Sequence, residues 1–361
     1  MRLRALLSEA GRDVSSGASR TLLAWAVFSS LLILLLMHEG IAVSTLVQQA
    51  AAFQEAGANT RIVSAPGRVD GAACDALASN YGVVSAAIKE TPEQLKARVM
   101  MAAPLRQYVA TPGIVNVLTA QDSSGEPVNK PGAIVSEQVL EQFGRETTTI
   151  EATYGPVDVA GSFRYPDDGR RDGLGFSAIY PEVTSDTPYD ECWIRSWPEV
   201  PDISAMLNSV VIPSEGTDLE PSEFTQWNTT LGTTFDGDLQ FENRASRFNA
   251  YLAFGVGLLV GLSSVRRRKL ELASARHAGV TMGSLVGIHI IQSTVWVFSG
   301  SVLGFLSIAA ISHPLGGSGT ALNLLGVRIL VLGALGALSG VCIGVCSIHE
   351  RALFGYFQAR D

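Results

Sequence analysis

Long apolar runs alternate with charged and polar segments along this chain of 361 residues. Four of the runs contain no acidic or basic residue, and each is near the roughly 20 residues that span the hydrocarbon core of a bilayer. Flanking apolar residues and long basic side chains make up the length of the shorter runs. The pattern therefore predicts four transmembrane helices. They occupy residues 21–37, 248–265, 285–311 and 329–348.

The first run has a second interpretation, because it follows four arginines in the N-terminal 20 residues and is only 17 residues long. A cleaved signal peptide has this arrangement. The sequence HEGIAVSTLVQQ that follows continues an apolar helical pattern and lacks a small-residue cleavage site. We therefore expect a retained anchor. Cleavage would remove only the first helix from the topology.

Charge is distributed unevenly between the segments that join these runs. Residues 38–247 carry 14 basic and 29 acidic side chains, a net charge of −15, whereas the rest of the chain carries +7. Basic segments stay on the cytoplasmic side of a membrane. This rule predicts a multi-pass protein of the cell membrane with both termini in the cytoplasm. The predicted cytoplasmic parts are an amphipathic segment at 1–20, a loop at 266–284 and a tail at 349–361.

The same rule places residues 38–247 and a short loop at 312–328 outside the cell. The outer segment mixes short strand-like runs with capped helical patterns, which favours an α+β domain. The predicted strands are 61–65, 113–120, 156–163 and 192–197, and the predicted helices begin at Asp70, Ser136 and Asp202. We expect surface turns or a mobile loop at 123–132 and 166–175, and a helical stalk at 41–56. The expected fold is an α-helical membrane protein with four transmembrane helices and a large extracytoplasmic α+β domain.

Composition agrees with a chain that is part membrane and part aqueous domain. Hydrophobic residues make up 47%, charged residues 17%, and the mean hydropathy is +0.24. These values are high for a soluble enzyme and low for a wholly embedded protein. Glycines recur every four residues in the apolar runs, a pattern that lets helices approach closely. They are Gly279, Gly283 and Gly287, then Gly300 and Gly304, then Gly336, Gly340 and Gly344.

The positions of the cysteines and histidines indicate one possible disulfide and no metal site. Cys74 and Cys192 are the two cysteines of the outer segment, where they form either a disulfide or two buried free thiols. Cys342 and Cys346 lie in the last apolar run without a third ligand, so we expect them to pack rather than bind metal. The five histidines form no ligand spacing. We predict no metal site.

Motifs for common catalytic chemistry are absent from the sequence. It contains no G-x-x-x-x-G-K-[ST] phosphate loop, no H-E-x-x-H pair and no G-x-S-x-G elbow. We therefore expect a protein that is not an enzyme, with no catalytic residue and no cofactor of its own. The excess of acid in the outer segment disfavours nucleic acid as a partner.

Four consecutive cations, Arg266 to Lys269, separate the second and third apolar runs. Their first role is to anchor the second helix at the cytoplasmic surface. The following LELASARHAG has the pattern of a short amphipathic helix. Such a helix, fused to a membrane helix, either receives force from a soluble partner or only rests on the lipid headgroups.

This loop resembles the cytoplasmic signature of the FtsX-like permease family, which includes the MacB-type transporters. The pattern is R-R-x-x-E-[LI]-A, with Arg five and Gly eight residues after the Glu. It is filled here by Arg267, Arg268, Glu271, Leu272, Ala273, Arg276 and Gly279. The layout is also similar, as is GAIVSEQVLEQFG followed by PVDVAGSF in the outer segment. The chain departs from the pattern at Lys269 and Leu270, where another basic or polar residue is usual, and in a less recognisable outer domain.

The resemblance implies a membrane subunit of an ATP-binding cassette transporter that exports or extracts an amphiphilic substrate. ATP would bind a separate ATPase subunit, and the permease would work as a homodimer or paired with a related permease, in contact with membrane lipid. In this interpretation Glu271, Arg276 and Gly279 shape the coupling helix, and Arg266, Arg267 and Arg268 anchor it. An alternative is a signalling scaffold whose outer domain regulates a cell-wall hydrolase or another external partner. A third is an anchor without an ATPase.

Overall fold

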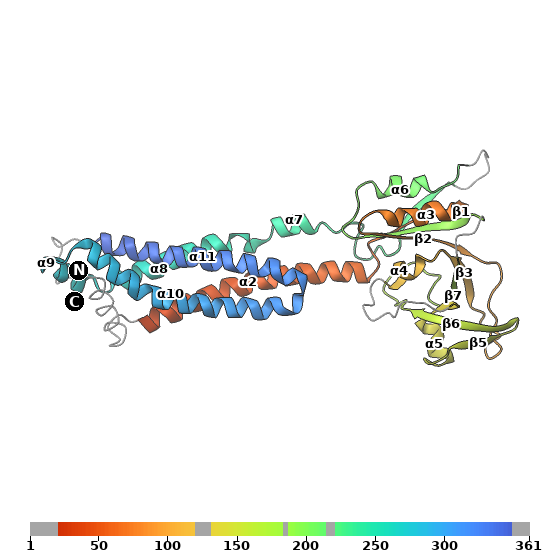
Figure 1. The fold of residues 1–361 in the computed structure, drawn as a ribbon, viewed down its shortest axis with the longest axis horizontal. Coiled ribbons are helices and arrows are strands. Elements are labelled where there is room, and N and C mark those ends of the chain that lie inside the picture. The colour runs from red at the N-terminus through yellow and green to blue at the C-terminus, as the bar shows by residue number, and fades with distance from the viewer. Residues whose placement is uncertain (1–20, 120–130, 183–186, 214–220, 349–361) are drawn as a thin grey trace. The chain divides into compact units, whose positions relative to one another are not determined.

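The computed structural model describes residues 21–119, 131–182, 187–213 and 221–348 (Figure 1). The chain forms two compact units. A helical unit contains the residues up to Gln49 and those from Asp236 onward, and an α/β unit contains Ala50–Phe235. The predicted amphipathic segment at 1–20, the tail at 349–361 and most of the predicted turn at 123–132 lie outside the described residues.

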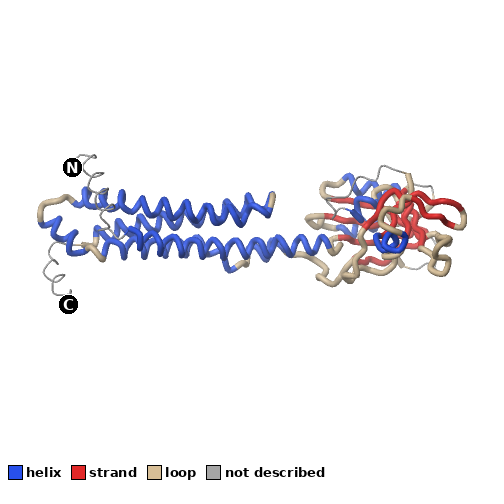
Figure 2. The backbone as a smooth tube through the Cα atoms, turned by 90° about the horizontal axis from the view of Figure 1, so that it is seen from below, coloured by secondary structure: helices blue, strands red, loops and turns tan. Residues whose placement is uncertain are grey.

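Long helices make up most of the helical unit (Figure 2). Among the described residues, four helices are long and apolar enough to cross a membrane. They are α2 (Thr21–Glu55), α8 (Asn249–Arg266, preceded by the 3-10 turn η2 at Ala245–Phe248), α10 (Met282–Ser312) and α11 (Gly317–Cys346). Shorter elements connect them. These are α7 (Gly237–Glu242), α9 (Lys269–His277) and the 3-10 turn η3 (His313–Leu315).

Two helices of this unit extend by ten residues or more beyond the apolar runs that predict them. Helix α2 continues past residue 37 to Glu55, because no proline interrupts the apolar pattern after the first run. Helix α11 begins at Gly317, so most of the loop predicted at 312–328 is helical. Packing explains this extension, since Gly319 lies against Ser312 and Gly326 lies against Ile308 of α10.

Helices α8 and α11 approach each other through glycine. At four glycines, the Cβ atom of an alanine would come within 2.2 Å of a backbone oxygen of the other helix. The four are Gly257 and Gly261 of α8 and Gly336 and Gly340 of α11. The predicted close packing at 336–344 and at 300–304 is confirmed, whereas a Cβ at Gly279 or Gly283 would meet nothing within 4 Å.

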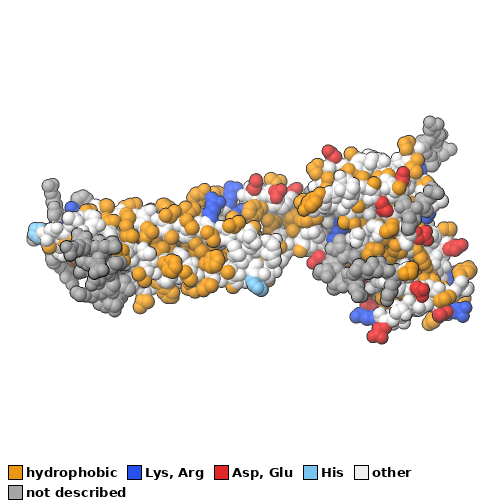
Figure 3. Space-filling view, viewed as in Figure 1, with side chains coloured by type: hydrophobic (Ala, Val, Ile, Leu, Met, Phe, Trp, Pro, Cys, Tyr) orange, Lys and Arg blue, Asp and Glu red, His pale blue; other side chains and the backbone are white. Residues whose placement is uncertain are grey.

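The outer surface of the helical unit is apolar. Hydrophobic side chains cover much of its visible face in Figure 3. Leu34, Leu259 and Phe298 are each more than 60% exposed, although they lie in helices that could span a membrane. Exposure of this kind suits a surface that contacts lipid chains rather than water.

The described residues of the α/β unit form one mixed sheet of nine strands in the order β5-β6-β4-β7-β3-β2-β8-β1-β9. Strands β3 and β7 pair in parallel, as do β4 and β6, and the other neighbours are antiparallel. The strands are β1 (Thr60–Val69), β2 (Val83–Glu90), β3 (Arg106–Ala110), β4 (Ala133–Ser136), β5 (Thr149–Ala152), β6 (Gly155–Phe163), β7 (Ser177–Pro181), β8 (Tyr189–Ser196) and β9 (Glu223–Gln226).

Short helices accompany the sheet. They are α3 (Gly71–Ala76), continued by the 3-10 turn η1 (Leu77–Ser79), then α4 (Ile114–Thr119), α5 (Glu137–Phe143) and α6 (Ile203–Ser209). The helices predicted to begin at Asp70, Ser136 and Asp202 are confirmed, and only Asp70 caps its helix through side-chain bonds, to the amides of Ala72 and Ala73. The combination is the α+β type that the sequence predicts.

Three of the four predicted strands are confirmed as β1, β6 and β8, and the fourth is wrong. Residues 114–119 form α4 instead. Their β-branched side chains favour a strand, but Ile114, Val117 and Leu118 are spaced three and four residues apart. All three are buried in the sheet's main hydrophobic cluster, and this packing stabilises the helix.

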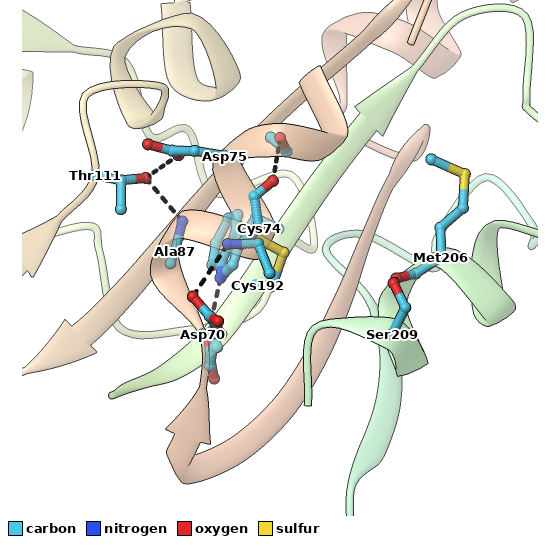
Figure 4. Close-up of a disulfide and its surroundings, with 12 residues drawn as sticks. Asp70, Cys74, Asp75, Ala87, Thr111, Cys192, Met206 and Ser209 are labelled. Atoms are coloured by element: carbon cyan, nitrogen blue, oxygen red, sulfur yellow. Dashed lines mark hydrogen bonds between the residues drawn. A yellow bond between two sulfur atoms is a disulfide. The ribbon is translucent and has the colours of Figure 1, made fainter. Parts of the chain in front are cut away.

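Cys74 of α3 and Cys192 of β8 are joined by a disulfide (Figure 4). Both cysteines are buried in a cluster with Val63, Val83 and Leu207. The bond links positions 118 residues apart, and closing so long a loop stabilises a domain by about 2 to 4 kcal/mol. It fastens α3 to β8, an interior strand of the sheet.

Beside the disulfide, Asp75 accepts a hydrogen bond from the hydroxyl of Thr111, which in turn accepts one from the amide of Ala87 at 3.0 Å (Figure 4). Burial raises the pKa of Asp75, and the bond from Thr111 partly opposes the shift. The Thr111 hydroxyl thus ties α3 to β2 next to the disulfide.

Gly336→Ala and Gly255→Ala should change stability in opposite directions. The methyl group at Gly336 would collide with the oxygen of Phe254, which we expect to cost about 1 to 3 kcal/mol. At Gly255 it enters open space, so the higher helix propensity of alanine should add up to about 1 kcal/mol. Unfolding of the full-length protein in mixed micelles measures both. Equal effects would contradict the close contact of α8 and α11.

Candidate functional sites: the α9 helix and the α2 joint

Helix α9 follows α8 after a turn of two residues and packs against three long helices. Its side chains Leu272 and Ala273 are buried in one cluster with apolar residues of α8, α10 and α11. Burying a leucine side chain contributes about 1.5 to 3 kcal/mol. The helix is therefore attached to the bundle and does not hang from it as a free loop. The cluster partners are Val265, Leu285, Val341, Val345 and Ile348.

Arg268 fastens the beginning of α9. Its guanidinium forms a two-pronged ion pair with the carboxylate of Glu271, with Nε 2.7 Å from Oε2. Its Nη1 also donates to Oε1 of Gln292 on α10 at 3.1 Å. The Arg268 side chain is 11% exposed and that of Glu271 is 60% exposed. The pair thus joins α9 to α10 while Glu271 still faces solvent.

The other end of α9 is held by Arg276 and Gly279. Arg276 Nη1 donates to the backbone oxygen of Ile348 at 2.6 Å, just after the end of α11. Gly279 has a φ of +89°, a conformation that favours glycine, and there the chain turns toward α10. These two residues position the helix between its neighbours.

The sequence-predicted residues thus fall into two groups. Arg268, Glu271, Arg276 and Gly279 make internal contacts or the turn that shape and hold α9, whereas Arg266 and Arg267 are exposed at the end of α8. Glu271, Ser274 and His277 follow one another at helical spacing and are exposed. This exposed face is the part of α9 open to a partner. The coupling role of all six residues stays a prediction.

The second site is the end of α2 inside the α/β unit. A helix leaves its last backbone oxygens without intrahelical partners. Here side chains from three segments of the unit donate to the oxygens of Gln54 and Glu55 and to two oxygens of the turn that follows the helix. We call this set of contacts the α2 joint. The pairs are Arg195 with the oxygen of Gln54 at 3.3 Å, Arg170 with that of Glu55, Asn228 with that of Ala56 at 3.1 Å and Gln226 with that of Ala58 at 2.6 Å.

Arg170 is an enclosed side chain of the α2 joint. It is 3% exposed, its Nε lies 3.1 Å from the carboxylate of Asp168, and its guanidinium lies 4.6 Å from the ring centre of Trp227. Trp227 in turn packs edge-on against Trp193 of β8. A cation at the C-terminal end of a helix interacts favourably with the helix dipole. Arg170 thus connects the end of α2 to the aromatic core of the sheet.

Arg195 lies in the buried strand β8 and also donates to the backbone oxygen of Val117 in α4, at 3.2 Å. Burial, together with the nearby charge of Arg170, lowers the pKa of Arg195 to about 10. The side chain therefore remains a cation at neutral pH. It joins α2, β8 and α4 at one point.

Sequence reasoning missed the α2 joint. The segment 166–175 is predicted as an exposed turn, but its Arg170 is buried. One signal was present: Arg195 interrupts the apolar run CWIRSW, and a cation inside a buried strand needs partners. The identity of those partners depends on contacts between residues more than 100 positions apart, which no local pattern contains.

A third polar cluster lies in the helical unit. Glu39 of α2 is 2% exposed, pairs with Nε of Arg244 at 3.0 Å and accepts from Asn249 of α8 at 3.4 Å. Asn249 also donates to the backbone oxygen of Leu35 at 3.0 Å, and His38 lies 3.2 Å from its side-chain oxygen. The cluster ties α2 to the start of α8.

Metal chemistry has no evident place in the described ranges. No group of three or more His, Cys, Asp or Glu side chains in them could hold an ion. Cys342 and Cys346 are free thiols of α11. The two sites described above join their elements through arginines, the carboxylates of Glu271 and Asp168, side-chain amides and backbone oxygens.

Few known proteins are similar to this chain. No protein-family model matches it, and no curated protein is similar to it in sequence. Among solved structures, the periplasmic region of MacB from Actinobacillus actinomycetemcomitans is similar over 54% of this chain and 97% of that one, with 12% identity and a TM-score of 0.33. A TM-score this low does not establish a shared fold.

Arg170→Met should loosen the end of α2, whereas Arg145→Met should not. The first change removes an enclosed ion pair and the donor to Glu55, at a cost of about 3 kcal/mol. Arg145 is 83% exposed and, among the described residues, forms its ion pair with Glu141, so its loss should stay within about 0.5 kcal/mol. Hydrogen exchange of the amides at 50–55 should accelerate only in Arg170→Met. Equal exchange in the two variants would show that the joint does not hold the helix.

Proposed function

We propose that this chain is the membrane subunit of an ATP-binding cassette permease. A separate ATPase docks on the exposed face of α9, and the movement of the helices reaches the α/β unit through α2. The observation that supports this most is the construction of α9, a short helix with one exposed polar face and one face packed on three long helices.

The contacts of α9 explain how a partner could move the bundle. A push on the exposed face would pass to α10 through Arg268 and Gln292, and to the chain after α11 through Arg276 and Ile348. The apolar cluster beneath α9 transmits the same displacement, because close-packed side chains shift together. The sequence motif that resembles the FtsX-like loop lies on this same helix.

Helix α2 supplies the second half of the route. It runs without a break from Thr21 to Glu55, and its last oxygens are held by the α2 joint. A helix with a fixed end passes on a rotation or a shift as a rigid element. In the working complex two permease chains, identical or related, would each carry such a helix.

The long helices contain few charged residues, which suits helices that transmit movement better than helices that line a wide polar channel for a substrate. Helix α10 has no charged residue, and the described charges of α8 and α11 are Arg266 and Arg328. Glu39 of α2 is paired with Arg244. Movement of the α/β unit would serve the extraction of an amphiphile. It would equally serve the alternative function, a scaffold that regulates an external protein.

Ser274→Trp should abolish binding of the ATPase, because the indole would block the exposed face of α9 without touching its buried contacts. Ser318→Trp is the matched control, since Ser318 is also exposed and lies at the first turn of α11. Co-purification in mild detergent with the ATP-binding cassette ATPase encoded nearest to this chain provides the measurement. We expect at least a tenfold loss of complex for Ser274→Trp and none for Ser318→Trp.

Retention of the complex in Ser274→Trp would contradict docking on α9. ATP turnover by the assembled complex in nanodiscs distinguishes extraction of an amphiphile from regulation of an external protein. Stimulation of ATP turnover by amphiphiles would support extraction. Stimulation only by a purified external protein would support the scaffold.

A further inference from the structure

A cavity of about 620 Å³ opens beside the edge strand β9 of the α/β unit. Its volume falls within the roughly 300 to 1,000 Å³ of small-molecule sites. Apolar side chains of α6 and the sheet edge form one part of its wall, and two arginines form another. The apolar residues are Ile203, Leu207, Phe224 and Trp227, and the arginines are Arg61 and Arg171.

The described residues that line the cavity include two arginines and no aspartate or glutamate. Arg61 is held by Glu199 through Nε and Nη2 at 3.1 and 2.7 Å, and its Nη2 also donates to the backbone oxygen of Thr233, which lines the cavity. Nη2 of Arg171 is held by Glu191 at 2.6 Å. Neither glutamate lines the cavity. Within the described ranges, Nη1 of each arginine keeps its donors for another acceptor. In a segment with a net charge of −15, a wall of this kind distinguishes anions from cations.

The cavity shares residues with the α2 joint. Trp227 lines the cavity and carries Arg170 on its ring, and Gln226 lines it and donates to the oxygen of Ala58. Gly169, next to Arg170 in the chain, lines it as well. A ligand that displaced any of these side chains would therefore alter how the end of α2 is held.

We propose that this cavity binds an amphiphile with a compact anionic headgroup, and that its occupancy is sensed at the α2 joint. The headgroup accepts hydrogen bonds from Arg61 and Arg171, and guanidinium groups favour phosphate and carboxylate oxygens. The acyl chain lies against Ile203, Leu207 and Phe224. This inference rests on the proposed function, because it names the class of substrate that the permease would handle.

Calorimetry on the full-length protein in nanodiscs of neutral lipid tests the binding without any ATPase. The probes are octyl phosphate and octyltrimethylammonium, which share a chain and differ in the sign of the headgroup, and empty nanodiscs correct for partition into lipid. We expect octyl phosphate to bind at least tenfold more tightly than the cation. Equal binding of the two, or no saturable binding of octyl phosphate, would overturn the proposal.

Two tryptophan substitutions on α6 locate the site. Ser204 lines the cavity and is exposed, whereas Ser209 is exposed on the same helix and does not line it. Ser204→Trp should weaken octyl phosphate binding at least tenfold, and Ser209→Trp should leave it unchanged. Equal effects of the two would place the ligand elsewhere and overturn the proposal.

Arg171→Gln tests the headgroup contact, since it removes the cation from the wall with little change in volume. Affinity for octyl phosphate should fall at least fivefold while the thermal midpoint of the protein stays within a few degrees. Undiminished affinity would contradict the role of Arg171. Failure of the ATPase to co-purify would refute the proposed permease but leave these binding results standing. Failure of binding alone would refute only the cavity.

Discussion

The α/β unit depends on how the last turn of α2 is terminated. A helix that ends inside a protein carries backbone oxygens that must find donors, because an unpaired buried oxygen costs about 1 to 3 kcal/mol. Here a strand and a loop supply donors through Arg195 and Arg170, and Asn228 and Gln226 of the sheet edge bind the oxygens of the turn that follows the helix. The same side chains extend to Trp227 and Asp168. The end of a long apolar helix is thereby fixed to the core of the unit.

The helical unit solves a different problem, because its long helices are apolar outside as well as inside. Burial of apolar surface cannot distinguish one packing from another in lipid. Shape does so instead: glycines at the contact of α8 and α11 bring the backbones together. Polar groups specify further contacts between the helices. Glu39 joins Arg244 and Asn249, and Arg268 joins Glu271 and Gln292.

The sequence was informative wherever one local property decided the outcome. Hydropathy alone predicts the four long helices, and Asp70 predicts the beginning of α3. The prediction fails where tertiary contacts decide: residues 114–119 become a helix through packing of Ile114 and Val117, and residues 317–328 extend α11 through contacts with α10. The burial of Arg170 could not be predicted from the sequence. Its segment is rich in Pro, Gly and Asp, as surface turns are, and only the contact with the end of α2 distinguishes it from one.

The most direct test asks whether the end of α2 and the sheet behave as one body. Spin labels at Ala51 of α2 and at Tyr154, both exposed, report the distance between them by double electron–electron resonance. Cys342 and Cys346 are first replaced by alanine, and the disulfide is left intact. We expect a narrow distance distribution in the otherwise native chain and a broad one in Arg170→Met. A native distribution as broad as that of the variant would contradict this expectation.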